Sequence, residues 1–208
     1  TNSNITFNGT VIGRNSATDD ALTLNMGTGI VEFNQQVGGA GNNDVGAIAI
    51  TGGLNLDAAI TSAASLTVST TSNLGASVTT SGLQTYSQAV TLSADNTLTS
   101  SGNADITFGT TTDGAQELTL VTTTGDIEFT GAVGGTTGLN GLTTTSAAFT
   151  AAAIKVGGAI SITNSGTGSI TGVISDDGAS AATLTKAGAG TLTLTGTNTY
   201  TGNTTVSA

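Results

Sequence analysis

Residues 118–135 read LTLVTTTGDIEFTGAVGG, and this stretch contains the pattern that decides the fold. Leu118-Thr-Leu120 and Ile127-Glu-Phe129 alternate apolar and polar residues, which is the period-2 pattern of a strand with one buried face. The glycine pair at 134–135 indicates a turn, because glycine adopts positive φ without a steric penalty. The stretch therefore predicts very short strands joined by tight turns.

A related stretch lies 96 residues earlier. Residues 22–39 read LTLNMGTGIVEFNQQVGG, and ten of the eighteen aligned pairs are identical to residues 118–135. Ile5-Thr-Phe7 likewise matches Ile106-Thr-Phe108 at an offset of 101. Small changes of offset at turns, with the strands retained, are expected when loop lengths vary within a repeat. We predict one solenoid segment, residues 1–208, that contains the long internal repeat 22–39/118–135.

The composition excludes several kinds of protein. Charged residues make up 8% of the 208 residues, against about 25% in an ordinary globular domain. Forty-five threonines and 31 glycines take their place, and threonine packs well on a pleated surface. The sequence has no Pro, which continuous sheet excludes, no Cys for disulfides, and no His, the commonest general base and metal ligand.

Together these features predict an all-β fold, a right-handed parallel β-helix of roughly ten coils. Groups of two or three short strands cover about 20 residues, which suits one coil, and coils stack about 4.8 Å apart. A single coil cannot bury its inward Leu, Ile, Val and Phe, whereas a stack encloses them in a continuous column. Tandem immunoglobulin-like sandwiches, whose size matches a repeat of about 96 residues, are the main alternative. The absence of Trp and Pro and the very short strands argue against them.

Residues 184–206 read LTKAGAGTLTLTGTNTYTGNTTV. This stretch resembles the passenger-associated repeat of autotransporter proteins, whose form is L-x-K-x-G-x-G-x-L-x-L-x-G-x-N-x-Y-x-G-x-T-x-V. We expect the glycines to allow turns and close contacts between coils, the central leucines to point inward, the tyrosine to cover the core at a corner, and the asparagine to bond the turn backbone. The structural repeat residues are Leu184, Gly188, Gly190, Leu192, Leu194, Gly196, Asn198, Tyr200, Gly202 and Val206.

The rest of the chain, with residues 82–92 and 125–135 as examples, resembles large exoproteins of the filamentous-haemagglutinin type. The two resemblances imply a right-handed β-helix, export to the bacterial outer surface or the extracellular space, and a role as a stalk or adhesin. The secretion domain and translocator barrel of those families are not recognisable here. We therefore expect the chain to be part of a longer polypeptide, and the export route stays open.

No catalytic residue, cofactor or metal is predicted. The adjacent carboxylate pairs Asp19-Asp20 and Asp176-Asp177 are better explained as turn residues than as an acid–base pair, which needs two carboxyl groups facing one substrate groove. The segment Gly38–Val45 is close to the calcium-binding nonapeptide of solenoids but has one residue too many. Lys155 and Lys186 could form an isopeptide bond only in an apolar pocket, which a thin solenoid is not expected to provide.

Two outward features of the repeat suggest binding surfaces. Glu32 and Glu128 occupy the same repeat position and would form an acidic stripe if they shared one face, although simple solubilising charges are the more economical interpretation. Ice-binding solenoids repeat T-x-T on one flat face. In this sequence threonine alternates through the single segment 191–201, and no coil-spaced recurrence of T-x-T is evident. Ice binding is therefore not favoured.

A net charge of −10 with three basic residues, Arg14, Lys155 and Lys186, argues against nucleic acid as a partner and against membrane insertion by this segment. The expected partners are neighbouring solenoid segments or identical subunits joined end to end, and host or glycan surfaces are further candidates. The predicted function is that of a structural, non-enzymatic segment of a bacterial cell-surface or secreted adhesin or stalk. The alternative is a self-assembling fibre subunit that stacks end to end.

Overall fold

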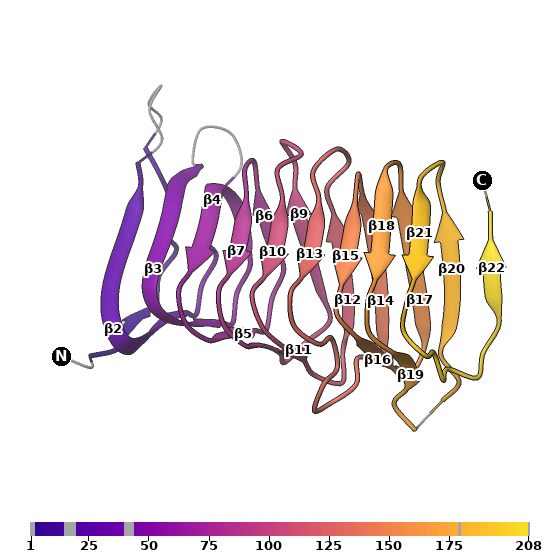
Figure 1. The fold of residues 1–208 in the computed structure, drawn as a ribbon. Helices are drawn as coiled ribbons and strands as arrows, with labels where there is room; N and C mark the ends of the chain where they lie inside the picture. The colour runs from indigo at the N-terminus through magenta and orange to yellow at the C-terminus, as the bar shows by residue number, and fades with distance from the viewer. Residues whose placement is uncertain (1–2, 15–19, 40–43, 179, 208) are drawn as a thin grey trace.

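The structure is a computed structural model that describes residues 3–14, 20–39, 44–178 and 180–207. These ranges contain 22 strands and no helix, so nothing within them could cross a membrane as a helix. Parallel strands stack into a β-solenoid of about nine turns, with the two termini at opposite ends of the rod (Figure 1). The predicted all-β solenoid is therefore confirmed, with about nine turns in place of roughly ten.

Each turn passes over three stacked rows of strands, which we name faces 1, 2 and 3 in the order in which the chain visits them. Three strands bend around a corner and contribute to two faces each: β2 (Leu22–Phe33), β3 (Val45–Leu56) and β4 (Ile60–Val68). The length of a turn varies, because the paired residues Leu22 and Ile48 are 26 positions apart and Ile48 and Leu66 are 18 apart.

Face 1 carries the first halves of β2 and β3 and the end of β4. It continues through parallel pairings of β7 (Gln84–Tyr86), β10 (Ile106–Phe108), β13 (Ile127–Phe129), β15 (Phe149–Ala151), β18 (Thr167–Ile170) and β21 (Thr191–Leu194).

Face 2 begins with β1 (Ile5–Phe7) and the second halves of β2 and β3. It continues through β5 (Ser72–Leu74), β8 (Val90–Leu92), β11 (Thr112–Asp113), an isolated bridge at Val133, β16 (Ile154–Val156) and β19 (Ile174–Asp176).

Face 3 begins with isolated bridges at Val11 and Val37 and with the start of β4. It continues through β6 (Val78–Thr80), β9 (Asn96–Ser100), β12 (Glu117–Val121), β14 (Gly141–Ser146), β17 (Ala159–Asn164), β20 (Thr183–Ala187) and β22 (Thr204–Val206).

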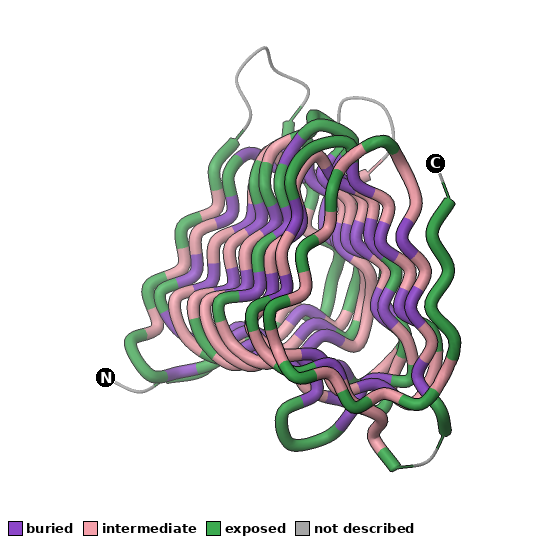
Figure 2. Tube along the Cα trace, turned by 45° about the vertical axis from the view of Figure 1, so that its right-hand side comes forward, coloured by how far each residue is buried: buried purple, intermediate pink, exposed green. Residues whose placement is uncertain are grey.

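The core is one continuous column of inward side chains. Buried positions recur at the same places in successive turns, with half-buried and exposed residues between them (Figure 2). On face 1 the rings of Tyr86, Phe108 and Phe129 stack, with centroids 5.2 and 4.4 Å apart, and Phe149 meets Phe129 edge to face at 6.2 Å. Stacking side chains on the coil repeat buries apolar surface that no single turn could cover, and each such side chain contributes about 1.5–3 kcal/mol.

The long repeat is not in phase with the faces. Leu22 pairs with Ile48 on face 1, whereas its repeat partner Leu118 pairs with Asn96 and Leu142 on face 3. Ile5-Thr-Phe7 lies on face 2, whereas the identical Ile106–Phe108 lies on face 1. The later copy of each repeated segment therefore lies one face earlier in the order 1, 2, 3 than the first copy does. The same tripeptide thus fits on more than one face of the solenoid.

Candidate functional site

The residues of the C-terminal repeat form the last turn and the C-terminal end of the solenoid. Leu184 is buried in β20, while Leu192, Leu194 and Tyr200 are half-buried against the core. Val206 on β22 is 77% exposed. The inward alternation is the same as in the middle of the rod, but here no further turn lies over it among the described residues.

The repeat glycines lie where the last turn approaches the turn before it. A Cβ atom on Gly190, Gly196 or Gly202 would overlap a backbone carbonyl oxygen of the preceding turn, that of Gly166, Gly172 or Ala182. Gly188 has a φ of +79°, a conformation that residues with a side chain rarely adopt. The spacing of glycines in the repeat therefore corresponds to close contacts between neighbouring turns.

Asn198 and Asp176 join the last turn to its neighbour. The Asn198 side-chain oxygen accepts a hydrogen bond from the Ile174 N–H at 2.8 Å. Asp176 Oδ1 accepts the N–H of Ala182 at 2.7 Å and that of Thr201 at 3.2 Å, and Oδ2 accepts the Thr201 hydroxyl at 2.8 Å. The Ala182 N–H, followed by the Thr201 hydroxyl, lowers the pKa of Asp176 below its ordinary value. This carboxylate anchors the repeat.

Tyr200 lies beside this anchor. Its hydroxyl forms a 2.6 Å hydrogen bond with the Thr204 hydroxyl, and its ring packs partly on the core. The tyrosine therefore spans the step from the last segment of face 2 to β22 on face 3.

Lys186 faces inward at a strand position where the alternation pattern predicts an apolar residue. It is 7% exposed, and its Nζ donates to the Ala187 carbonyl at 2.6 Å and to the Gly188 carbonyl at 3.0 Å. It pairs in register with Ile162 below and Val206 above. With Leu184, Leu192 and Val206 it lines a hollow of about 430 Å³ at the open end.

Four further carboxylates, those of Asp95, Asp105, Asp113 and Asp126, accept backbone N–H groups of the following turn. Asp105 accepts the N–H of Asp126 at 2.8 Å, and Asp126 accepts the N–H of Ala148 at 2.9 Å. Asp95 accepts the N–H of Glu117 at 2.8 Å. These carboxylates therefore satisfy turn N–H groups that the sheet ladder leaves unpaired.

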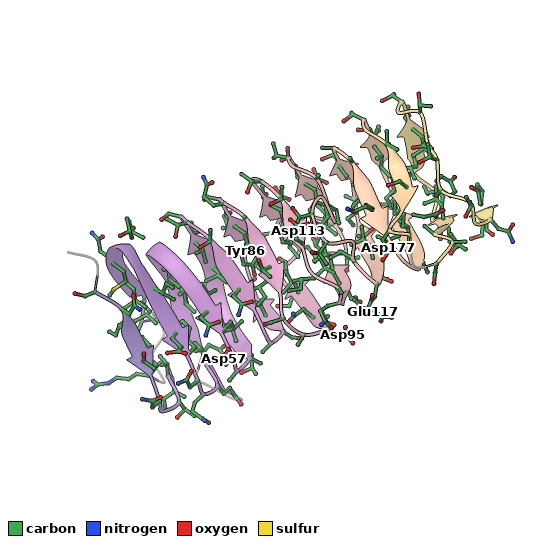
Figure 3. The ribbon with its side chains drawn as sticks, turned by 90° about the horizontal axis from the view of Figure 1, so that it is seen from below. Asp57, Tyr86, Asp95, Asp113, Glu117 and Asp177 are labelled. Atoms are coloured by element: carbon green, nitrogen blue, oxygen red, sulfur yellow. The ribbon has the colours of Figure 1, made fainter. Side chains whose placement is uncertain are left out.

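The labelled acidic residues are spread along the rod (Figure 3). Among the described residues no three acidic, Cys or His side chains are close enough to hold a metal ion. Asp19 and residues 40–43 of the suspected calcium segment lie outside the described residues. Asp177 follows the Asp176 anchor directly in sequence and takes part in an interaction of its own.

Glu32 and Glu128 do not form a stripe, because Glu32 lies on face 2 and Glu128 on face 1. Instead, Glu32 takes part in a polar ladder that runs along face 2. Its carboxylate accepts the Thr6 hydroxyl at 2.9 Å and the Asn55 amide at 3.3 Å, and Asn55 accepts the Asn73 amide at 2.7 Å. The ladder lines a shallow hollow of about 320 Å³ beside the exposed Ile30.

Face 3 carries two columns of outward side chains, most of them hydroxyl-bearing, that the sequence did not reveal. The columns have a spacing of one turn and contain no charge, whereas the exposed Glu117 lies on the same face outside them. The first column is Thr97, Thr119, Thr143, Ser161, Thr185 and Thr205, and the second is Thr79, Thr99, Val121, Thr145, Thr163 and Ala187.

The strict T-x-T triplet occurs on this face at Thr97–Thr99 and Thr143–Thr145, which are two turns apart, so hydroxyl groups recur at the turn spacing although T-x-T itself does not recur from one turn to the next. Unequal turn lengths disguise the period in the sequence, because 22 residues separate the paired strands at Asn96 and Leu118 and 24 separate those at Ile160 and Leu184. A thermal-hysteresis measurement is the direct test of ice binding by this face.

Several polar side chains point inward at the corner that follows face 3. Thr80, Ser100, Ser146 and Asn164 are buried at matching positions of successive turns. Asn164 donates its amide to the carbonyls of Gly166 and Thr191 at 2.7 and 2.9 Å. No sequence signal separates these residues from the outward threonines, since both kinds of position use the same residue types.

Comparison with protein families is consistent with this geometry. The fold is a β-solenoid of parallel strands, and residues 184–208 match the passenger-associated-transport-repeat. The matched residues are the last turn and open end described above. Neither the curated proteins nor the solved structures gave a match to the chain.

Proposed function

We propose that this chain is a structural segment of a bacterial cell-surface or secreted protein, and that it acts as a stiff stalk that extends and displays other parts of that protein. The observation that carries the proposal is the uninterrupted ladder of parallel strands over an unbroken core. Each inner turn is hydrogen-bonded to the turns on either side, so bending or stretching the rod strains many bonds at once.

The passenger-associated repeat in the last turn supports export to the outer surface or the extracellular space. The absence of cysteine is compatible with this route, because a chain without disulfides can be threaded unfolded through a pore. Most of the carboxylates whose contacts are described cap turns, which supports a structural rather than a catalytic use of the acidic residues.

A stalk made of equivalent turns should tolerate a change of length by whole turns. Residues 66–83 form one turn, since Leu66 and Gln84 pair in register on face 1. We expect deletion of 66–83 to give a folded rod that is shorter by about 4.8 Å, measured by small-angle X-ray scattering. The control is deletion of 66–82, one residue fewer, which puts Leu83 in the place of Leu66, turns the inward side chains of the following strand outward and should abolish cooperative unfolding. If both deletions unfold the chain, turns are not interchangeable units of length and the stalk function is contradicted.

Adhesion is a second candidate function, and the polar ladder on face 2 favours it. Glu32, Asn55 and Asn73 present carboxylate and amide groups beside the exposed Ile30, a combination suited to the hydroxyl groups and apolar faces of a glycan. On a glycan array, we expect binding that is lost in Asn55→Ala/Asn73→Ala and retained in Thr150→Ala, an outward substitution on face 1. An array without signal for the unmodified chain would count against adhesion through glycans.

A further inference from the structure

The hollow on face 2 is formed around a missing side chain. Its floor is the buried Gly53, which pairs in register with Ile30. A Cβ atom on Gly53 would lie 3.3 Å from Ile30 Cγ1 and 3.4 Å from the Thr71 carbonyl oxygen, so even a small side chain would fill this floor. Ile30, 43% exposed, provides an apolar wall. The hollow of about 320 Å³ is therefore large enough for one small ring, at the lower end of the size range of ligand pockets.

The hydrogen bonds around the hollow consume donors and leave acceptors. The Asn55 amide nitrogen donates to Glu32 Oε1 and to Asp57 Oδ2, both at 3.3 Å, which uses both of its hydrogens. The Asn73 amide nitrogen donates to Asn55 Oδ1 at 2.7 Å. Within the described part of the chain, the Glu32 carboxylate accepts this amide and the Thr6 hydroxyl, although a carboxylate has about four lone-pair sites. A ligand in this hollow should therefore bring hydrogen-bond donors.

The charges around the hollow have one sign. Glu32 lines the hollow, and the Asp57 carboxylate lies on the other side of the same Asn55 amide. The three basic residues of the chain all lie in the described ranges, and none of them lines the hollow. Coulomb attraction therefore favours a cationic ligand over an anionic one. An ammonium group meets both conditions, because it carries a positive charge, three donors and no acceptor.

We propose that the face 2 hollow binds an amino sugar, with its ammonium group on Glu32, a ring hydroxyl toward Asn73 Oδ1 and an apolar ring face against Ile30. Glu32 and Asn73 are two turns apart, about 10 Å at about 4.8 Å per turn, so the ring lies along the rod. The Asn4 side-chain oxygen accepts the Ile30 N–H at 2.9 Å, which leaves the Asn4 amide nitrogen for a sugar oxygen. The inference rests on adhesion as the function and names the class of glycan.

Two oligosaccharides of equal length test the charge of the ligand. One is an oligomer of glucosamine, and the other is the oligomer of N-acetylglucosamine, in which acetylation removes the positive charge. By isothermal titration calorimetry we expect the glucosamine oligomer to bind the purified chain at least tenfold more tightly, with an advantage that shrinks as salt is raised. Equal affinities would overturn the amino-sugar assignment and leave adhesion standing. If neither oligomer binds, the assignment is overturned as well, and the glycan array decides separately whether adhesion stands.

The long repeat provides a matched control, which is needed because a chain with a net charge of −10 attracts polycations in general. Glu32→Gln and Glu128→Gln remove the same charge from the same repeat position, but Glu128 lies on face 1, away from this hollow. We expect Glu32→Gln to weaken binding of the glucosamine oligomer at least tenfold and Glu128→Gln to weaken it less than twofold. Urea denaturation checks that both variants are folded. Equal losses would mean unspecific attraction and would overturn the site.

A third variant tests the shape of the hollow without changing its charge. Gly53→Ala adds a methyl group to the floor, and Gly141→Ala on face 3 is the control, because a Cβ there lies at a similar 3.4 Å from the nearest atom. We expect only Gly53→Ala to weaken binding of the glucosamine oligomer severalfold, while binding of a lysine oligomer of equal charge stays unchanged. Unchanged binding of the sugar in Gly53→Ala would overturn the proposal. Tighter binding of the lysine oligomer, lost in Glu32→Gln, would identify a basic protein segment as the ligand in place of a glycan.

Discussion

The middle of the solenoid and its C-terminal end use the same alternation of residues but differ in what covers them. Phe108 in the middle is fully buried between Tyr86 and Phe129, whereas Leu194 and Val206 at the end occupy equivalent inward positions and remain partly or largely exposed. The difference shows that burial in this fold comes from the neighbouring turn and not from the residue's own strand. Stability should therefore depend on the position of a residue along the rod more than on its type.

The largest effect is expected in the aromatic stack. Phe108→Ala should lower the free energy of unfolding by about 3–5 kcal/mol, because it removes a buried ring and leaves a cavity between two others. Urea denaturation followed by circular dichroism measures the change. A loss below about 1 kcal/mol would mean that the middle turns are no better packed than the end.

A smaller loss is expected where turns approach closely at the C-terminal end. Gly190→Ala should cost about 1–3 kcal/mol, since the added Cβ would overlap the Gly166 carbonyl oxygen and push two turns apart. The control is Gly9→Ala, because a Cβ on Gly9 meets no atom within 4 Å. Equal denaturation midpoints for the two variants would show that the last turn can move away freely.

The next effect depends on pH. The folded pKa of Asp176 is lowered, so its contribution to stability is present above the unfolded pKa of about 3.9 and is lost as the pH falls through the folded value. In Asp176→Asn the free energy of unfolding should therefore fall less steeply as the pH drops below about 4. Thr201→Val should reduce this pH dependence by a smaller amount. Urea midpoints between pH 2 and 7 provide the measurement. An unchanged acid limb in Asp176→Asn would mean that this carboxylate does not hold the last turn.

The smallest effect is expected at the open end. Val206→Ala should change the free energy of unfolding by no more than about 0.5 kcal/mol in dilute solution, because the side chain is 77% exposed. A loss of several kcal/mol at low protein concentration would mean that Val206 is covered in the monomer. That result would remove the contrast between the end and the middle.

The sequence was sufficient to predict the strands and the solenoid, because triplets such as Ile106–Phe108 and Leu192–Leu194 keep their period-2 alternation. The sequence could not assign strands to faces, because turns of 18 and of 26 residues follow one another. In addition, the offset of the long repeat does not correspond to a whole number of turns, so its two copies lie on different faces. For that reason the hydroxyl columns on face 3 were missed.

Inward polar residues were also beyond reach of the sequence. Lys186 and Gln84 satisfy the same alternation as leucine. The Gln84 amide donates to the Thr99 carbonyl, which only the folded chain brings near, and the Lys186 ammonium donates to the carbonyls of the next two residues, which the alternation does not reveal. The repeat at residues 184–206 was recognisable because its glycines and apolar residues keep a fixed spacing within one turn.

The two tyrosines give the rod a pair of built-in optical probes. The chain has no Trp, so Tyr86 in the middle and Tyr200 at the end are the main sources of its ultraviolet signal. Burial raises the pKa of the Tyr86 phenol far above its ordinary value, and its hydroxyl donates to Gln84 at 3.1 Å. In Tyr200→Phe, tyrosinate absorbance in alkaline solution would come from Tyr86 alone. The rate at which this absorbance increases would therefore measure how fast the central turns open to solvent. In Tyr86→Phe, tyrosine fluorescence would come from Tyr200 alone and would report local unfolding of the last turn.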